Sequence, residues 1–233
     1  MPREETHFFH RDDRYPQGHA HYLDLLGIDD TETRIVGDDT PAYAYVPEVP
    51  SRIHAMVPDV KLIWLLRNPV KRAFSNYWHV AKKGNETRSF SRAVRDERQG
   101  KNDSIWHNYL RRSCYAEQIR RYYAYFAPEQ HCFVCMESMV QSPLEEINRI
   151  CAFLNIAPFE AVELPHENKT RYPRVRWFNK LKTYNAVQSS PLLYKTARKL
   201  SSLSSYKHKP QVPTGLYKEL MDYFTDDIAE TAR

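Results

Sequence analysis

Alternating apolar and polar blocks divide the chain into predicted strands and helices. An unbroken apolar run within the segment 60–67 has strand length, and such a run indicates a strand buried on both faces of a parallel sheet. Asn68 and Pro69 suit the N-cap and first position of a helix, which we expect over 70–83 up to a stop at Gly84. A strand that leads through a tight turn into a helix is the repeating unit of α/β folds.

The same alternation continues along the chain. A short helix is predicted from Pro47 through 51–57, ended by Pro58, and a second buried strand over 130–136. Further helices are predicted over 105–126, 143–154, 192–203 and 216–232. Loops are expected for the remainder of 158–213. Strands alternating with helices predict an α/β fold.

Composition places the chain among ordinary globular proteins. Its 233 residues fit one large domain, with 42% hydrophobic and 27% charged residues. The net charge of +5 suits an anionic ligand but is small for a nucleic-acid-binding protein. Such a protein could use the 16 Tyr and 10 Phe for stacking, yet many of them lie in apolar, core-like segments, so no nucleic-acid partner is predicted. No apolar run is long enough to cross a membrane.

The cysteines and histidines offer little chemistry of their own. The chain has four cysteines, too few for a disulfide framework. Cys132 and Cys135 lie in the predicted strand 130–136, so buried structural thiols are favoured over a redox pair or metal ligands. The pair His19 and His21 is too weak a pattern for a metal site, and no metal is predicted.

The strongest candidate site is the turn between the apolar strand and the helix that follows it. Arg67 lies at the carboxyl end of the strand, and Ser75 lies about two turns into the helix. Ligands of parallel sheets bind beyond the carboxyl ends of the strands, where a helix N-terminus favours anions. Arg67 can donate two hydrogen bonds to a phosphate, and Ser75 can add a neutral donor. The alternative is a surface ion pair at Arg67 and a small packing residue at Ser75.

Residues 61–77 resemble the 3′-phosphate-binding motif of sulfotransferases that use 3′-phosphoadenosine-5′-phosphosulfate (PAPS). The resemblance implies a P-loop NTPase-like fold, a parallel sheet flanked by helices, and a single sulfotransferase domain over 1–233. It also implies that PAPS is the donor and that the desulfated nucleotide PAP is the product. Arg67 and Ser75 would then hold the 3′-phosphate.

Two early segments carry the implied acceptor chemistry. Residues 4–9 (Glu-Glu-Thr-His-Phe-Phe) are similar to the Lys-Glu-x-His-Phe-Phe segment of heparan sulfate and bacterial carbohydrate sulfotransferases. The resemblance implies that Glu5 is the general base and that His7 orients the acceptor or shares its proton. Residues 37–43 resemble Gly-Glu-Lys-Ser/Thr-Pro-x-Tyr, but Asp39 stands where some members have a Lys that contacts an anionic glycan. That difference argues against a heparan-like acceptor.

Later segments imply further nucleotide contacts. The segment 112–119 resembles the family's Ser/Gly-x-Tyr helix and assigns Tyr115 to the nucleotide. The segments 168–173 and 206–210 fall where members place nucleotide-binding loops, which adds three more residues: Tyr172, Lys207 and Lys209. The two lysines substitute for the family's Lys-Gly-Arg sequence; a solvated basic loop is the alternative for them.

One element of the family is not found in these residues. The six glycines are at least nine residues apart, so the sequence has no glycine-rich loop of the kind that binds the 5′-phosphosulfate. In relatives this loop precedes the Glu-x-His-Phe-Phe segment. We therefore expect the chain to be an incomplete sulfotransferase domain that lacks the first strand and this loop, and some residues at its C-terminal end. The alternative is a catalytically inactive PAP- or PAPS-binding protein, or an interaction protein, on the same fold.

The remaining expectations follow from the resemblance. The chain is expected to move a sulfuryl group from PAPS to a hydroxyl or amine of a carbohydrate or small molecule, once the loop is supplied. Its partners are the nucleotide and an acceptor that the sequence does not identify, and the sequence does not indicate an oligomeric state. The cytoplasm is the expected compartment, with the Golgi lumen as the alternative if an N-terminal anchor precedes the chain.

Overall fold

A computed structural model of the chain divides into two compact units. The first consists of Met1–Leu65, Tyr115–Val134 and Glu145–Phe159, and the second of Leu66–Cys114, Cys135–Leu144 and Glu160–Arg233. The structure describes residues 5–28, 35–102, 104–163, 172–173, 180, 184, 189–191, 193, 195–196, 205–206 and 210–233.

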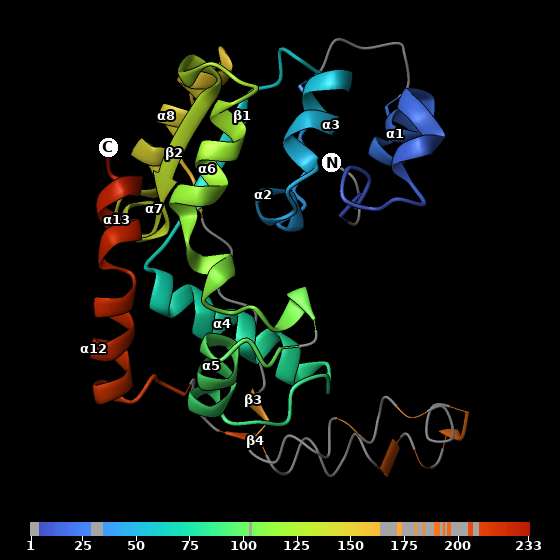
Figure 1. Cartoon of the computed structure of the whole chain (residues 1–233). Helices are drawn as coiled ribbons and strands as arrows, with labels where there is room; N and C mark the ends of the chain where they lie inside the picture. The colour runs from blue at the N-terminus through green and yellow to red at the C-terminus, as the bar shows by residue number, and fades with distance from the viewer. Residues whose placement is uncertain are drawn as a thin grey trace. The chain divides into compact units, whose positions relative to one another are not determined.

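The first unit combines a small sheet with short helices (Figure 1). Its helical elements are η1 (Tyr15–Gln17), α1 (Gly18–Leu26), α2 (Ala42–Tyr45), α3 (Val49–Met56), α6 (Tyr115–Tyr123), η4 (Pro128–Gln130) and most of α8 (Pro143–Leu154), where η denotes a 3-10 helix. The strands β1 (Leu62–Leu66) and β2 (His131–Cys135) pair in parallel as a two-stranded sheet. The predicted α/β class is confirmed.

Strand β1 is packed on one face only. Trp64 is buried against the ring of Tyr122 from α6, with 4.9 Å between the centroids. Ile63 and Leu65, which point to the other face, are 45% and 50% exposed. The prediction of a strand buried on both faces is therefore wrong, because an apolar run indicates strand length but not how many faces are covered by packing.

The N-terminal segment folds onto α1 and α2 through aromatic side chains. Phe8 and Phe9 are buried, and both rings lie within 5 Å of the Tyr22 ring. The Tyr43 ring packs edge-on against Phe9 at 5.5 Å. This cluster fixes the loop that carries Glu5 and His7.

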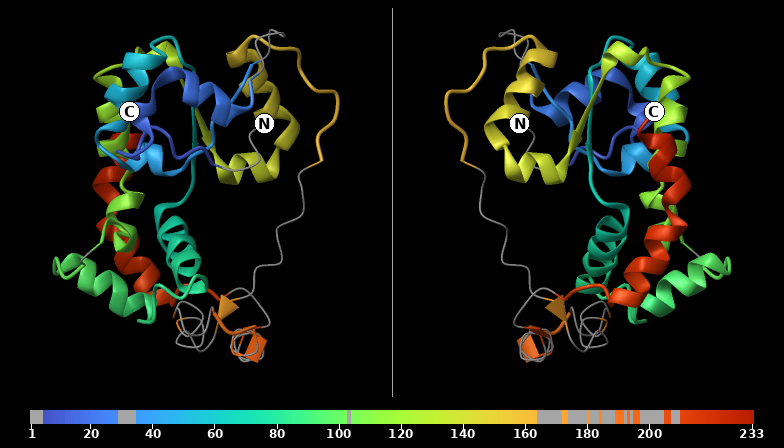
Figure 2. Two further views of the ribbon diagram at one scale, coloured as in Figure 1. Left: turned by 90° about the vertical axis from the view of Figure 1, so that its right-hand side faces the viewer. Right: turned by 90° about the vertical axis from the view of Figure 1, so that its left-hand side faces the viewer.

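The second unit is mainly helical. Its elements are α4 (Pro69–Lys82), α5 (Phe90–Arg98), η2 (Ile105–His107), η3 (Arg111–Ser113), α7 (Met136–Gln141), β3 (Tyr172–Pro173), β4 (Ser205–Tyr206), α12 (Thr214–Tyr223) and α13 (Thr225–Thr231). Strands β3 and β4 form a short antiparallel pair. Helix α12 lies beside α4 (Figure 2).

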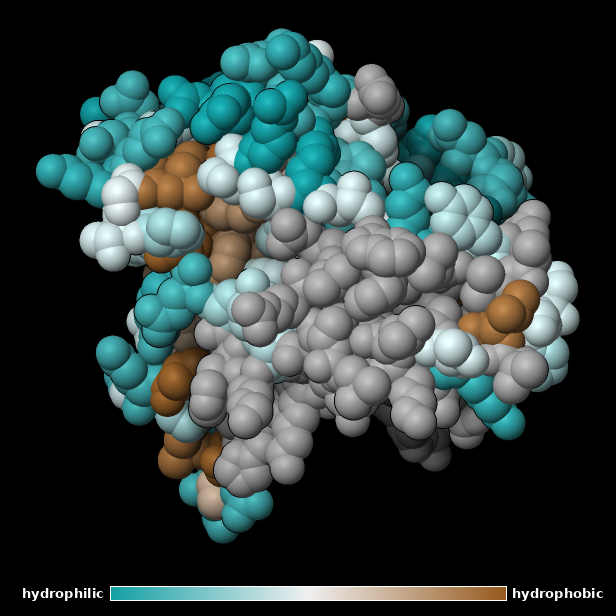
Figure 3. Space-filling model, turned by 90° about the horizontal axis from the view of Figure 1, so that it is seen from below, coloured by the Kyte–Doolittle hydropathy of each residue, from teal (hydrophilic) through white to brown (hydrophobic). Residues whose placement is uncertain are grey.

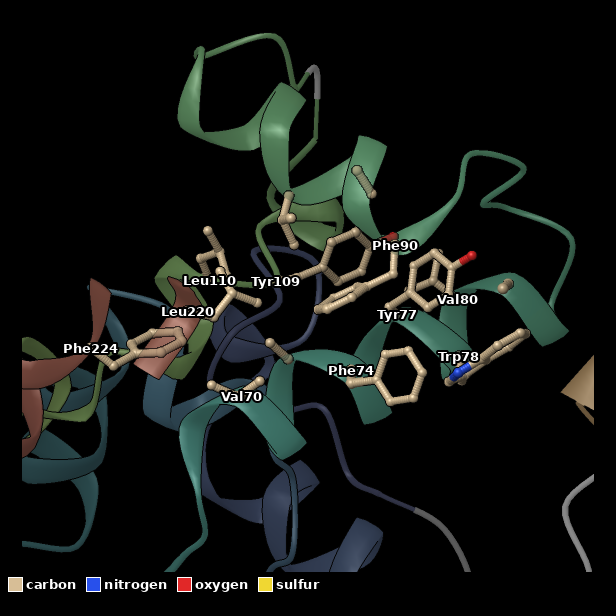
Figure 4. Close-up of a cluster of buried hydrophobic side chains, with 14 residues drawn as sticks. Val70, Phe74, Tyr77, Trp78, Val80, Phe90, Tyr109, Leu110, Leu220 and Phe224 are labelled. Carbon is tan, nitrogen blue, oxygen red and sulfur yellow. The ribbon is translucent and has the colours of Figure 1, made fainter. Parts of the chain in front are cut away.

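Helix α4 forms as its sequence predicts. The Asn68 side chain accepts a hydrogen bond from Lys71 N at 3.0 Å, Pro69 occupies the first turn, and the helix ends before Gly84, which has a φ of 85°. Its apolar side chains recur at helical spacing and contribute to the core shown in Figure 4. The buried residues are Pro69, Val70, Ala73, Phe74, Tyr77, Trp78, Val80 and Ala81. The opposite side of α4 therefore remains exposed.

The segment predicted as one helix over 105–126 is divided into η2, η3 and α6. The carboxylate of Glu97 accepts hydrogen bonds from the backbone N–H groups of Leu110 and Arg111 at 2.9–3.0 Å. The Ser113 hydroxyl donates to the Tyr109 carbonyl at 2.7 Å. The Glu97 carboxylate thus pairs with backbone donors that a continuous helix would pair internally, which divides the segment.

Most other predicted elements are confirmed. Helices α3 and α8 occur where predicted, whereas the helix over 216–232 is split into α12 and α13 at the buried residue Phe224. The helix predicted over 192–203 lies largely outside the described residues. Cys132 is buried as expected; the expectation for Cys135 is wrong, because this exposed residue ends β2 and N-caps α7.

In the view from below, the exposed hydrophobic residues form several separate patches (Figure 3). Hydrophobic residues in the coloured part of that face lie in separate groups among hydrophilic ones. No helix among the described residues is long and apolar enough to span a membrane.

Candidate functional site

Helix α4 lines a cavity of about 650 Å³ in the second unit with exposed residues and with the edge of its buried side. Arg67, directly after β1, and Ser75, within α4, both line it, so the two residues predicted to act together share one pocket. Tyr172 of β3 also lines the pocket, and its contact with a nucleotide stays a prediction. The other lining residues are Lys71, Phe74, Trp78, His79, Lys82, Pro210, Gln211, Val212 and Tyr217.

Positive charge follows the α4 side of the pocket. Lys71, Ser75 and Lys82 are exposed residues at positions that share one face of the helix. The N-terminal end of α4, next to Arg67, adds the partial positive charge of a helix N-terminus. An anion in this pocket would meet ammonium and hydroxyl donors on one face of α4 and the Arg67 guanidinium next to the start of that helix.

Glu137, just after β2, contacts the N-terminal end of α4. Its Oε1 accepts a hydrogen bond from Asn68 N at 3.3 Å and lies 3.9 Å from Lys71 Nζ. Because β1 and β2 are parallel, their carboxyl ends lie at the same edge of the sheet, which brings Glu137 close to the turn after β1. Glu137 thus orients Asn68 and Lys71 and does not itself line the pocket.

Aromatic rings form the apolar part of the pocket. The Trp78 ring contacts Tyr172 edge-on with 5.5 Å between centroids, and it contacts Phe74 at 5.9 Å. The Tyr217 hydroxyl accepts a hydrogen bond from Asn68 Nδ2 at 3.0 Å. Rings beside cationic donors suit a ligand that has both a planar base and phosphates.

The pocket fits a nucleotide in size and chemistry. Small-molecule sites occupy about 300–1,000 Å³ and combine apolar walls with a few polar groups. The cavity volume falls in this range, and Arg67, Ser75 and Lys82 offer the donors that phosphate requires.

Glu5 and His7 form a separate pair in the first unit. His7 Nε2 lies 3.4 Å from Glu5 Oε2, and the two side chains are 39% and 47% exposed. A half-exposed carboxylate next to an imidazole can accept a proton from a substrate hydroxyl or amine.

Three further residues were predicted to contact the nucleotide: Tyr115, Lys207 and Lys209. Tyr115 begins α6 in the first unit, whereas Arg67, Ser75 and Tyr172 are in the second. Lys207 and Lys209 lie outside the described residues. In the described part of the chain, no cluster of three or more His, Cys, Asp or Glu side chains could hold a metal ion.

The sequence alone did not identify Lys71, His79 or Lys82 as pocket residues. Their signal was present: a helix predicted over 70–83 places positions 71, 75, 79 and 82 on one face. The aromatic contribution of Tyr217 depends on tertiary contact between α12 and α4, which no local pattern indicates.

Comparison with known proteins identifies the family. A family model described as the sulfotransferase family matches residues 3–161, which include Glu5, His7, Arg67 and Ser75. The chain belongs to the sulfotransferase family. The part of the pocket formed by Tyr172, residues 210–212 and Tyr217 lies beyond the matched segment.

Similar sulfotransferases include animal and bacterial proteins. The chain is 31% identical over 225 residues to human heparan sulfate glucosamine 3-O-sulfotransferase 6, covering 94% of the chain and 59% of that enzyme. It is 35% identical over 152 residues to the mouse protein of that name, covering 65% and 43%. A crystal structure of a sulfotransferase from Alicyclobacillus acidocaldarius has a TM-score of 0.58 and 25% identity, with 84% and 87% covered. The chain thus spans about half the length of these animal relatives.

Proposed function

We propose that the α4 pocket binds PAPS and its product PAP, with the 3′-phosphate held by Arg67 and Ser75. The observation that supports this most directly is that both side chains line one nucleotide-sized cavity. Lys71 and Lys82 add positive charge to the same helix face, and Tyr172 and Trp78 offer rings to the base. Membership of a family that generally uses PAPS is consistent with this ligand.

We further propose that the chain serves sulfuryl transfer to a hydroxyl or amine of a carbohydrate or small molecule. PAPS supplies the sulfuryl group and a phosphate leaving group. Glu5 would take the proton from the attacking oxygen or nitrogen, and His7, 3.4 Å away, would orient the acceptor or share that proton. A new bond to sulfur forms as the donor's sulfur–oxygen bond breaks, which leaves PAP.

The acceptor is proposed to be less anionic than heparan sulfate. The animal relatives are named for heparan sulfate glucosamine. In this chain the exposed Asp39 lies next to Thr40, whose Oγ1 accepts from His7 N at 3.4 Å. An exposed carboxylate at this position, next to the residue that binds the His7 backbone, would repel a polyanionic glycan.

Calorimetric titration with PAP tests the nucleotide site. Arg67→Ala should weaken PAP binding by about 1.5–3 kcal/mol, the scale of a charge-assisted hydrogen bond. Arg95→Ala is the matched control, because Arg95 is an exposed residue of α5 that does not line the pocket. Equal loss of affinity in both variants, or no loss in Arg67→Ala, would refute the assignment.

A further inference from the structure

The carboxylate of Asp38 contacts the loop that carries Glu5 and His7. Asp38 Oδ2 accepts from the hydroxyls of Thr6 at 2.5 Å, Tyr43 at 2.8 Å and Tyr22 at 3.4 Å. Its Oδ1 accepts from Thr40 Oγ1 at 2.8 Å. All four hydroxyl-bearing residues are buried.

Two of these hydroxyls connect Asp38 to the backbone of the loop. The Tyr43 hydroxyl accepts from Phe8 N at 3.0 Å and from Phe9 N at 3.3 Å. The Thr40 hydroxyl accepts from His7 N at 3.4 Å. The Thr40 hydroxyl donates its only proton to Asp38, so its lone pair stays directed at the His7 N–H group. The Tyr43 hydroxyl lies 2.8 Å from Asp38 Oδ2 and 2.7 Å from Thr6 Oγ1, so these three groups share two hydroxyl protons.

Thr6 provides a third connection. Its side chain is 2% exposed and points inward to Asp38 and Tyr43, whereas its neighbours Glu5 and His7 are half exposed. Anchoring the residue between them sets the direction in which both functional side chains leave the backbone.

The backbone of His7 needs such support. Its φ of 51° lies in the left-handed region, which side-chain-bearing residues rarely adopt. This conformation persists only where surrounding contacts hold it, and it places the imidazole next to Glu5.

We propose that Asp38 is the positioning residue for the Glu5–His7 pair, acting through Thr6, Thr40 and Tyr43. The role of the pair itself rests on the proposed function. Burial next to this carboxylate also keeps both tyrosines as phenols: burial, more than any other cause, raises the pKa of Tyr43 to about 12 and raises that of Tyr22 as well.

Asp38→Asn tests this role by nuclear magnetic resonance without requiring transfer. Asparagine keeps the shape but replaces one acceptor oxygen with a donor, so it cannot accept all four hydroxyls. Amide exchange of Phe8 and Phe9 should accelerate by about fivefold or more, the effect of weakening one hydrogen bond, with β2 amides unchanged. The ring signals of His7 should shift in the same direction as in Glu5→Gln, and the double variant should show no additional shift.

A second test variant and a control variant complete the experiment. Tyr43→Phe retains the ring packing but removes the bridging hydroxyl, so it should reproduce both changes even if Asp38→Asn fails to fold. Asp24→Asn changes an exposed aspartate of α1 and should alter neither signal. Unchanged Phe8 and Phe9 exchange, or a His7 signal that moves independently of Glu5, would overturn the proposal. Failure of PAP binding, or of transfer by the chain supplied with a glycine-rich phosphate loop, would refute the proposed function and leave this result standing.

Discussion

At the residue scale, Glu5 and Arg67 have different proposed roles: Glu5 accepts a proton during transfer, and Arg67 binds the nucleotide. Its partner is His7 at 3.4 Å, and neither residue lines the pocket of the second unit. We therefore expect Glu5 to act in transfer and Arg67 in nucleotide binding, so the two substitutions should affect different measurements.

Glu5→Gln keeps the side-chain shape and removes the base. Turnover should fall by about 10²–10⁴-fold, the usual contribution of a positioned base, while PAP affinity stays unchanged. The assay uses labelled PAPS and a panel of hydroxyl and amine acceptors. It is run on the chain joined upstream to a glycine-rich phosphate loop, because the 233 residues contain none.

Glu48→Gln is the control for this assay, since Glu48 is an exposed glutamate of the same unit. Equal turnover in Glu5→Gln and the parent protein would remove Glu5 from the mechanism. PAP binding without transfer by the parent protein would favour the non-catalytic alternative.

The sequence identifies some site residues and not others for a physical reason. Arg67 and Ser75 belong to one strand–turn–helix segment, so their proximity follows from local structure. Asp38 contacts Thr6 across 32 residues, and such a contact depends on tertiary packing. No spacing in the sequence indicates it.

At the element scale, the β1–β2 pair contains a polar contact that acid should break. Trp64 Nε1 donates to His131 Nδ1 at 2.9 Å, and both residues are buried. Burial lowers the pKa of His131 below its ordinary value of 6.5. The contact needs neutral imidazole, because a protonated ring has no acceptor.

The sign of the pH effect follows from this lowered pKa. Below about pH 6.5 the unfolded chain takes up a proton at this histidine that the folded chain does not, so stability falls as the pH drops. The urea midpoint should therefore decrease less between pH 7.5 and 5.5 in His131→Leu than in the parent protein. His54→Gln changes an exposed histidine and should retain the parental decrease. The same decrease in all three proteins would contradict this account.

Elements with local signals were predicted well. Helix α4 has a capping Asn, an N-terminal Pro and a following Gly, and helix α8 begins directly after Ser142 at Pro143. The single helix predicted over 105–126 was wrong, because the carboxylate of Glu97 in α5 accepts hydrogen bonds from backbone N–H groups of that segment. The exposed face of β1 was also missed, since burial depends on neighbouring elements.

At the scale of the whole molecule, each compact unit carries one part of the proposed chemistry. The first contains Glu5, His7 and the Asp38 network, and the second contains the α4 pocket. The sequence predicted the α/β class and the family, because the strand–turn–helix motif is local and specific. It did not predict two compact units, since their boundaries depend on contacts between distant segments.

The central claim is that the α4 pocket recognises the 3′-phosphate of the nucleotide, and calorimetry with two ligands tests it most directly. PAP and adenosine 5′-phosphate differ only in that phosphate. The parent protein should bind PAP at least about tenfold more tightly, and Arg67→Ala should abolish most of this preference while binding adenosine 5′-phosphate as before. Equal affinity of the parent protein for both ligands, or an undiminished preference in Arg67→Ala, would contradict the account.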